Sequence, residues 1–328
     1  MTSLIAGFLV LGGVTFALAA AACALVLGGL RRWAVIDSPN ARSSHRRPTP
    51  RGGGLGFMAV ILAVWAALWL TGSPVVTPAV IAGAAAIAGI SFADDLKTVH
   101  VGVRLAVQAL AVGLALATFP GDTPIVADFL PLAVDRLIVA LAWLWFINLF
   151  NFMDGIDGIA GGEAAIVAFG LVILAALRPE LAPVGREAIV VGAAVVGFLL
   201  FNWPPARVFM GDVGSAGLGF VLGWLLVVAA AGGARVPALL LPLYFVVDAT
   251  TTLAARAWKR RPLAQAHRDH AYQNAVDVGR SQALVSTLVV GLGVVLIALA
   301  VFALSAPLPA LALGLVLTAA FIVWLRLG

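Results

Sequence analysis

An all-α, polytopic integral membrane protein is the fold class that this sequence predicts, on the basis of its composition, its hydropathy and the lengths of its apolar stretches. The 328 residues are 62% hydrophobic and 11% charged, with a mean hydropathy of +1.09. A soluble domain of this size has no core large enough to bury so much apolar surface. A helix needs about 20 apolar residues to cross roughly 30 Å of bilayer hydrocarbon. The long apolar stretches are therefore predicted to be membrane-spanning helices of a single domain, residues 1–328, with no soluble domain.

Eleven such spans can be placed along the chain. They cover approximately residues 4–30, 55–71, 76–92, 103–120, 131–150, 159–177, 187–202, 214–231, 236–255, 284–304 and 308–326. The first is long enough to be tilted. Because Arg31 and Arg32 follow it instead of preceding it, it is predicted to be a retained helix and not a signal peptide. The single cysteine, Cys23, lies in this span and excludes an internal disulfide.

Lysine and arginine are distributed unequally between the two ends of these spans, and cytoplasmic connections are enriched in both residues. One end holds four of them, Arg136, Arg178, Arg186 and Arg235. The other end holds sixteen: Arg31, Arg32, Arg42, Arg46, Arg47, Arg51, Lys97, Arg104, Arg207, Arg256, Lys259, Arg260, Arg261, Arg268, Arg280 and Arg326. The N-terminus is therefore predicted outside and the C-terminus in the cytoplasm.

The same asymmetry predicts cytoplasmic loops near residues 31–54, 93–102, 151–158, 203–213 and 256–283. All four histidines and the acidic motifs fall in these loops, so chemistry is expected on the cytoplasmic face. The net charge of +5 suits anionic lipid headgroups there. Nucleic acid is not an expected partner, because the basic residues are divided among loops beside the membrane.

Asp94 and Asp95 end an apolar run of small residues. One interpretation is a helix end that the two acids merely solvate. Adjacent carboxylates, however, raise each other's pKa, and acids at a helix C-terminus oppose the helix dipole. A divalent metal ion or a basic partner offsets both effects, and Lys97 and Arg104 are close in sequence. We therefore expect a cation beside this pair.

The segment NLFNFMDGIDG is the most specific signal in the chain. Asn148, Asn151 and Asp154 are spaced by three residues, so on a helix they form one polar stripe that Asp157 continues. Glycines after each acid permit the close approach of a ligand. The structural alternative is hydrogen bonding between helices by the asparagines.

Asp212 lies in a Gly-Asp-x-Gly-Ser turn after a double proline. It is either an N-cap for a helix that begins near Val213 and Gly214, or a carboxylate placed beside backbone amides for a metal-chelated phosphate.

The loop 256–283 carries His267 and His270 beside Arg268. Their spacing is a weak zinc signal without an HExxH pattern. These side chains are instead interpreted as cationic or hydrogen-bonding groups for phosphate, with a solvated basic loop as the alternative. Asp248, within the ninth span, could contact substrate, relay protons or pair with residues 250–252, and the sequence does not rank these roles.

Carboxylates, cations and amides at one membrane face indicate a site for Mg²⁺ and phosphate, with Mn²⁺ as an alternative metal. Four motifs carry a resemblance: ADDLK, NLFNFMDGIDG, FNWPPARVFMGDVGS and HRDHAYQ. These motifs resemble those of the polyprenyl-phosphate N-acetylhexosamine-1-phosphate transferases, bacterial glycosyltransferase family 4. They occur in the same order and on the same side of the membrane as in that family, and the resemblance extends from about Pro48 to Gln273. The HRDHAYQ loop lacks the triple histidine of the peptidoglycan enzyme and is closer to the O-antigen-initiating branch.

The resemblance implies transfer of an N-acetylhexosamine or deoxy-N-acetylhexosamine 1-phosphate from a UDP-sugar to undecaprenyl phosphate, with release of UMP. This reaction would start cell-envelope glycan assembly, O-antigen or related, at the cytoplasmic face of the bacterial inner membrane. The sequence does not determine which sugar is transferred, and it leaves both a monomer and a homodimer open.

The resemblance also assigns roles. Asp94 and Asp95 would face the lipid phosphate, Asn202 and Phe209 would hold the uridine, and Arg104 stands where a family lysine often appears. The expected catalytic residues are Asp94, Asp95, Asp154, Asp157, His267 and His270; the substrate-binding residues Asn151, Asn202, Phe209, Arg104 and Arg268; and the metal ligands Asp212 and Asp154.

Direct attack by the lipid phosphate is the expected mechanism, because a phosphate monoester is already largely ionised at pH 7; a two-step route through an aspartyl phosphate is the alternative. Two other classes of protein remain as rivals. An ion-coupled transporter would keep its acids near the midplane in paired repeats, and no repeat is evident. A CDP-alcohol phosphotransferase would need an arginine that Asp157-Gly-Ile-Ala-Gly lacks.

Overall fold

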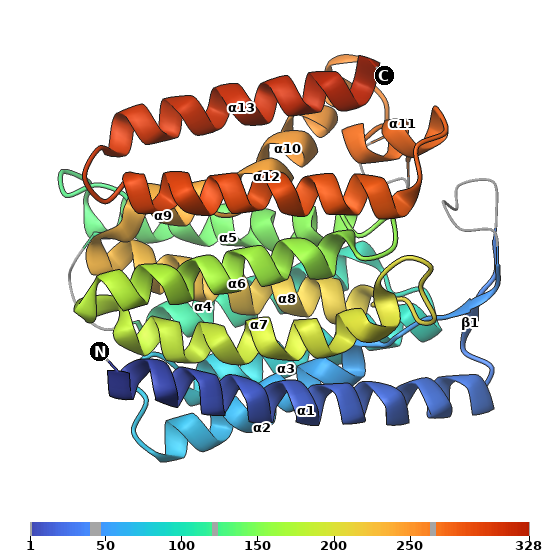
Figure 1. Ribbon diagram of the computed structural model, residues 1–328, viewed down its shortest axis with the longest axis horizontal. Coiled ribbons are helices and arrows are strands. Elements are labelled where there is room, and N and C mark those ends of the chain that lie inside the picture. Colours follow the sequence, from blue (N-terminus) through green and yellow to red (C-terminus); the bar gives the residue numbers. More distant parts are fainter. Residues whose placement is uncertain (1, 40–46, 120–123, 263–266, 328) are drawn as a thin grey trace.

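The computed structural model describes residues 2–39, 47–119, 124–262 and 267–327. In the described chain, helices run roughly parallel in one bundle, with the N- and C-termini at opposite ends (Figure 1). Among the described residues, eight helices are long and apolar enough to cross a membrane. The prediction of a polytopic, mostly helical membrane protein is confirmed.

The helices follow the predicted spans closely over most of the chain. Their bounds are α1 Thr2–Arg32, α2 Gly54–Leu70, α3 Pro78–Leu96, α4 Val101–Ala117, α5 Leu132–Phe152, α6 Ile159–Leu177, α7 Ala182–Asn202, α8 Asp212–Ala229, α9 Arg235–Leu240, α10 Leu243–Trp258, α11 Ala271–Asp277, α12 Gln282–Phe302 and α13 Pro307–Leu327. A short 3-10 turn, η1 Pro179–Leu181, precedes α7. Of these, α2 and α4 are apolar but shorter than the eight candidate spans.

The ninth predicted span is not one helix. It divides into α9 and α10 around Leu241 and Pro242, because proline has no amide hydrogen to continue the hydrogen-bond ladder. The connection between the predicted spans 214–231 and 236–255 is also helical: Ala230–Ala234 forms a π-helical turn, η2, in which Gly233 has a φ of 93°. Helix α8 therefore runs on almost to α9.

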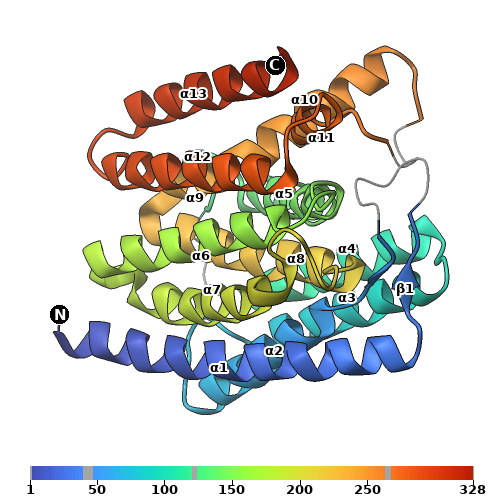
Figure 2. The same cartoon turned by 45° about the vertical axis from the view of Figure 1, so that its right-hand side comes forward.

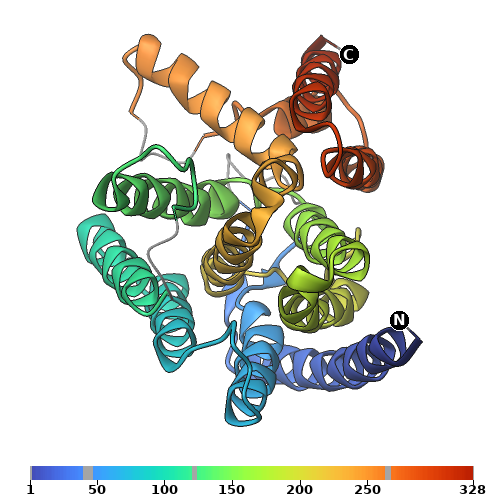
Figure 3. The ribbon, with the colours of Figure 1, turned by 90° about the vertical axis from the view of Figure 1, so that its left-hand side faces the viewer.

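Helix α8 lies at the centre of the bundle, as the end-on view shows (Figure 3). It packs against α3, α5, α6 and α7, and most of its residues are buried. Small residues permit the close approach: a Cβ on Gly219 would lie 2.7 Å from the Cα of Ile147 in α5. The indole nitrogen of Trp143 donates to the carbonyl of Phe220, 3.1 Å away. Helices α5 and α8 are therefore held in a fixed position relative to each other, including the ends that are predicted to face the cytoplasm.

Two short strands, β1 Ile36–Asp37 and β2 Thr49–Pro50, pair antiparallel in the loop after α1. The chain is mostly helical, as predicted, and these two short strands are a local addition: Pro50 has no amide hydrogen to continue a helix, so the backbone groups beside it need other partners. The pairing continues through Arg51, which bridges Phe209. Phe209 donates its amide to the Pro50 carbonyl at 2.8 Å, and its carbonyl accepts from Gly53 at 2.9 Å. The strand thus fixes Arg51 beside the start of α8.

The predicted loop 256–283 is also more ordered than expected. Helix α10 reaches Trp258 and α11 occupies residues 271–277. Helix α11 packs against α13 and α12, at the same end of the bundle as β1 (Figures 1 and 2).

Candidate functional site

Asp94 and Asp95 lie in the last turn of α3, which continues four residues beyond its predicted end at 92. The Asp95 carboxylate is fully buried and accepts the amides of Asp212 at 2.9 Å and Val213 at 3.1 Å. These are unpaired amides at the start of α8, which a carboxylate satisfies favourably. Asp95 therefore caps α8 from another helix.

Gly211 precedes α8 with a φ of 74°, a left-handed conformation that favours glycine. A Cβ at this position would lie 2.6 Å from Oδ2 of Asp95. Helix α8 begins at Asp212, and no side chain of its own caps it. Of the two alternatives for Asp212, the N-cap is therefore not observed: Gly211 is the N-cap residue, and Asp95 supplies the carboxylate that accepts the first amides.

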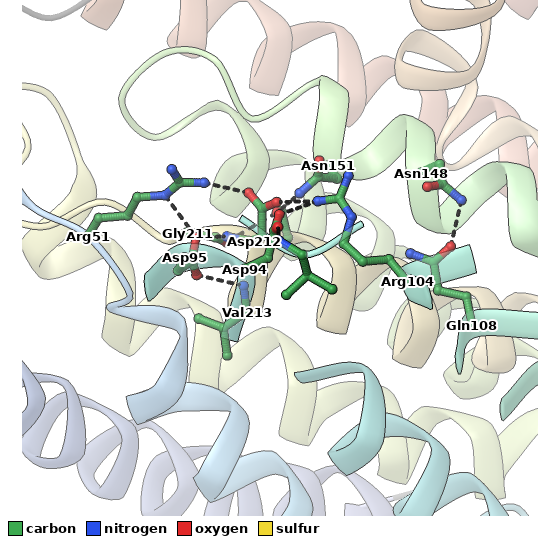
Figure 4. Close-up of polar contacts among 12 residues, drawn as sticks. Arg51, Asp94, Asp95, Arg104, Gln108, Asn148, Asn151, Gly211, Asp212 and Val213 are labelled. Carbon is green, nitrogen blue, oxygen red and sulfur yellow. Dashed lines mark hydrogen bonds and ion pairs between the residues drawn. The ribbon is translucent and has the colours of Figure 1, made fainter. Parts of the chain in front are cut away.

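Asp212 lies between two guanidinium groups (Figure 4). Its Oδ1 is 2.7 Å from Nη2 of Arg51, and its Oδ2 is 3.1 Å from Nη1 of Arg104. Arg51 also contacts Asp95, with Nε to Oδ1 at 2.8 Å, and Arg104 pairs with Asp94. The expected basic partner of the acid pair is present, and it is Arg104. Three carboxylates and two guanidiniums thus form one ion-pair network.

Arg51 is the residue of this network that the sequence reasoning missed. Burial would lower the pKa of its guanidinium, but the neighbouring carboxylates of Asp212 and Asp95 raise that pKa above its ordinary value. The sequence signal was the basic loop before a glycine run, and nothing in its spacing identified which arginine meets Asp212. The pairing comes from the strand that bridges Phe209.

The asparagines of the polar stripe make the interhelical hydrogen bonds that were the structural alternative. Asn148 donates to Oε1 of Gln108 in α4 at 2.8 Å, and Asn151 donates to Oγ of Ser215 in α8 at 2.9 Å. The stripe is shorter than predicted, because α5 ends at Phe152. Asn151 therefore places the end of α5 against α8, and substrate binding by its amide stays a prediction.

Asp154 lies in the turn after α5. In the described part of the chain, no group forms a hydrogen bond or ion pair with its carboxylate. Burial, together with the negative charge of Asp212, raises the pKa of Asp154 to about 7, although Arg51 opposes the shift. When it is ionised, the Asp154 carboxylate has a negative charge that no neighbouring cation among these residues neutralises directly, and the Asp212 carboxylate is close to it. The two carboxylates are therefore suitable ligands for a bound cation.

Asp157 and Asn202 hold the loops around the site. Oδ2 of Asp157 accepts the amide of Ala206 at 2.8 Å. Oδ1 of Asn202 accepts the amide of Gly158 at 3.0 Å, and its Nδ2 donates to the Val208 carbonyl at 3.0 Å. The two side chains tie the turn after α5 to the segment before α8. Their predicted contacts with substrate are untested, as is the stacking of uracil on Phe209.

Asn202→Ala is expected to lower the free energy of unfolding by about 1–3 kcal/mol, because it leaves a buried amide and a buried carbonyl without partners. Thermal unfolding in detergent measures the change. Asn274→Ala in α11, a partly buried asparagine outside these two loops, is the control. An equal loss for both variants would contradict the bracing role.

The HRDHAYQ segment reaches the site through α11. The Tyr272 hydroxyl donates to the carbonyl of Phe152 at 3.3 Å, two residues before Asp154. His270 is buried and stacks on Tyr272, with ring centroids 5.8 Å apart. Burial lowers the pKa of His270 to about 3 and also lowers that of His267. This low pKa opposes a cationic role for His270, and both expected roles of the two histidines stay predictions.

Arg268, the remaining predicted phosphate ligand, forms an ion pair with Asp277 at the end of α11. The pair holds the segment to its own helix. A contact between Arg268 and phosphate stays a prediction.

The donor set fits a divalent cation of the kind that binds through few protein ligands. Among the described residues, no three His, Cys, Asp or Glu side chains come close enough to form a complete metal site. Magnesium commonly uses one or two carboxylates and completes its shell with water and substrate phosphates. Asp212 and Asp154, which interact electrostatically, are the carboxylates that could hold it.

Comparison with known proteins places this geometry in a family. Residues 77–230, which include α3, the turn after α5 and the start of α8, match the family described as glycosyl transferase family 4. The chain is 30% identical over 292 residues to a decaprenyl-phosphate N-acetylglucosaminephosphotransferase of Mycobacterium tuberculosis, covering 76% of this chain and 71% of that protein.

Two further relatives are similar over shorter stretches. A probable undecaprenyl-phosphate N-acetylglucosaminyl 1-phosphate transferase of Bacillus subtilis is 26% identical over 261 residues, 75% of this chain and 71% of its own. A phospho-N-acetylmuramoyl-pentapeptide-transferase of Latilactobacillus sakei is 34% identical over 200 residues, 55% of this chain and 61% of its own. Since the likeness runs through the helices that carry the ion-pair network, the chain belongs to glycosyl transferase family 4.

Proposed function

We propose that this protein transfers a sugar 1-phosphate from a UDP-sugar to undecaprenyl phosphate and releases UMP. The observation that supports this most strongly is the position of Asp212 between Arg51 and Arg104, beside Asp154, whose carboxylate has no partner among the described residues. Two phosphate-bearing substrates need cations for their oxygens and a carboxylate-held metal between them. The named activities of the relatives belong to the same reaction class.

The cytoplasmic face of a bacterial inner membrane is the proposed location of the site. Support comes from the excess of arginine and lysine at the end of the spans that carries Asp94, Asp95 and Asp212. The acids of the site gather at one end of the bundle, at the end of α3 and the start of α8. A transporter would hold them near the midplane, so the transferase is favoured over the transporter.

In the proposed reaction a phosphate oxygen of the lipid forms a bond to the phosphorus that carries the sugar, and the bond from that phosphorus to the UMP oxygen breaks. Bound Mg²⁺ would supply charge neutralisation for the diphosphate and the leaving phosphate. The guanidiniums of Arg51 and Arg104 would stay paired with their carboxylates and bind phosphate oxygens through their other N–H groups.

Direct attack is favoured over an aspartyl-phosphate route by the surroundings of the acid pair. Both oxygens of Asp94 are engaged, one by the Val99 amide at 2.7 Å and one by Arg104. Both oxygens of Asp95 accept amides of α8. Neither carboxylate is free to attack phosphorus. Asp94, through Arg104, is instead placed to orient the acceptor phosphate.

The sugar is proposed to be an N-acetylhexosamine or its deoxy form, used to start O-antigen or a related cell-envelope glycan. A panel of UDP-sugars, assayed with purified protein, undecaprenyl phosphate and Mg²⁺, tests the proposal. We expect UMP release from at least one N-acetylated donor, and only when lipid phosphate is present. Release of UMP without the lipid, with label on an aspartate, would favour the two-step route. No release from any donor, together with solute uptake by reconstituted vesicles, would reject the function.

A further inference from the structure

Asp248 is a buried carboxylate that the proposed reaction does not use. It lies in α10 and is 0% exposed. Its Oδ1 and Oδ2 accept the Ala271 amide at 3.1 and 3.0 Å, and they also receive the hydroxyls of Thr252 and Tyr244, each at 3.2 Å. Nη2 of Arg326 in α13 is 3.4 Å from Oδ1. Because these groups surround the carboxylate, it has no open side for a substrate.

The Ala271 amide is the first of α11, so Asp248 caps that helix from α10. Amides in the first turn of a helix lack partners within it, and a carboxylate there is favourable. Arg326 completes the arrangement by donating to Oγ1 of Thr252 at 2.8 Å. The start of α11 is thereby held to both α10 and α13.

The other end of α11 is also held by α13. The guanidinium of Arg280, just after α11, lies 3.9 Å from the ring centroid of Trp324, a cation–π contact. Figures 1 and 2 show α11 beside the C-terminal end of α13. Two residues of α13, Trp324 and Arg326, therefore fix the position of α11.

Helix α11 in turn packs against the turn that carries Asp154. Tyr272 is fully buried and donates to the Phe152 carbonyl. Gly155 has no room for a side chain, since a Cβ there would lie 2.9 Å from Nε2 of Gln273. A displacement of α11 must therefore displace residues 152–155.

We infer that Asp248, with Arg326, is a positioning residue: it holds α11 so that Tyr272 and Gln273 support the turn bearing Asp154. The expected effect on catalytic turnover rests on the proposed function. The expected effect on the position of residues 152–155 does not, because it needs no substrate. It also selects among the roles that the sequence left open. Asp248 is a partner of Thr252 and α11, and not a substrate contact.

The test compares Asp248→Ala, Asp248→Asn and Arg326→Gln by hydrogen–deuterium exchange and by steady-state kinetics. We expect Asp248→Ala to raise exchange at residues 150–158 and 267–277, but not at 213–222 of α8. Its kcat should fall by roughly tenfold to a hundredfold, as for a small misplacement of a catalytic group, with a smaller change in KM. Asp248→Asn should retain more activity, because its amide oxygen still accepts from Ala271.

Glu187→Gln is the matched control, since Glu187 is also a buried carboxyl, in α7, and it pairs with Ser73 and Arg186 instead of with residues of α10, α11 or α13. It should leave exchange at both segments unchanged. Lost turnover in Asp248→Ala with unchanged exchange at 150–158 would overturn the inference, as would full turnover with raised exchange. If Asp248→Ala does not fold, Asp248→Asn and Arg326→Gln decide by the same criteria. If the wild type turns over no UDP-sugar, the proposed function fails, while exchange still tests the positioning.

Discussion

Asp212→Asn is expected to reduce sugar-phosphate transfer by at least about a hundredfold to a thousandfold, the size of effect seen when one preorganised electrostatic group is removed from an active site. The substitution removes the charge shared by Arg51 and Arg104. The new amide can direct its NH₂ group at one of the guanidiniums, which repels it. It also removes one of the two carboxylates proposed to hold Mg²⁺. UMP release at saturating substrate measures kcat, and a magnesium titration measures the metal requirement.

Asp128→Asn is the matched control for this substitution. Asp128 also pairs with an arginine, Arg235, but it is exposed and lies in the connection between α4 and α5, away from the site. Its replacement should leave kcat within about twofold of wild type, as for most exposed ion pairs. If Asp212→Asn turned over at the wild-type rate, Asp212 would have no role in catalysis, whichever reaction the protein performs.

Asp154→Asn is expected to abolish transfer and yet stabilise the metal-free protein at high pH. The pKa of Asp154 is raised from 3.8 to about 7, so the folded state holds a proton that the unfolded state releases. Stability from this group is therefore full below pH 4 and is lost as the pH rises to about 7. Asparagine lacks this penalty, and the gain at pH 8 should be on the order of 1–3 kcal/mol after allowance for partial exposure.

Thermal unfolding in EDTA at pH 5 and pH 8 measures this difference. The wild-type Tm should fall more than the variant Tm between the two pH values. Added Mg²⁺ should raise the wild-type Tm at pH 8, because it binds the ionised carboxylate, and should raise that of Asp154→Asn much less. Asp128→Asn, which removes an exposed carboxylate whose pKa Arg235 lowers, should not stabilise the protein. If the Tm of wild type and that of Asp154→Asn change equally between pH 5 and pH 8, ionisation of Asp154 does not destabilise the folded protein and the prediction is wrong.

Hydropathy located the helices well but placed some of their ends wrongly. The apolar window of α3 stops near residue 92, whereas the helix continues to Leu96. Apolar length reports the thickness of hydrocarbon that a helix crosses, and a helix can extend beyond it with polar residues. The acids were therefore expected in a loop, and they lie on a rigid helix end. Pro242, by contrast, was a visible signal for the break between α9 and α10.

The motifs named most of the residues of the site but not the contacts that each of them makes. Asp95 was expected to face a lipid phosphate, and it caps α8. Asn148 and Asn151 were expected to form one polar stripe, and both join α5 to its neighbours, while substrate binding by Asn151 stays a prediction. A carboxylate or amide suits either task chemically, so residue type alone does not decide between them. Only the partner within about 3 Å decides.

The sequence by itself determined the class of protein, the approximate spans, the family and the set of acids and amides at one membrane face. These features follow from the lengths of the apolar stretches and from the order of the motifs, and neither depends on which residues meet in the folded protein. Only the tertiary structure decided which charges meet: Arg51 with Asp212, Asp95 with the amides of α8, and Asp248 with α11. The energy of a charge depends on burial and on the distance to its partner, and residues 51, 95 and 212 are brought together only by the packing of separate helices.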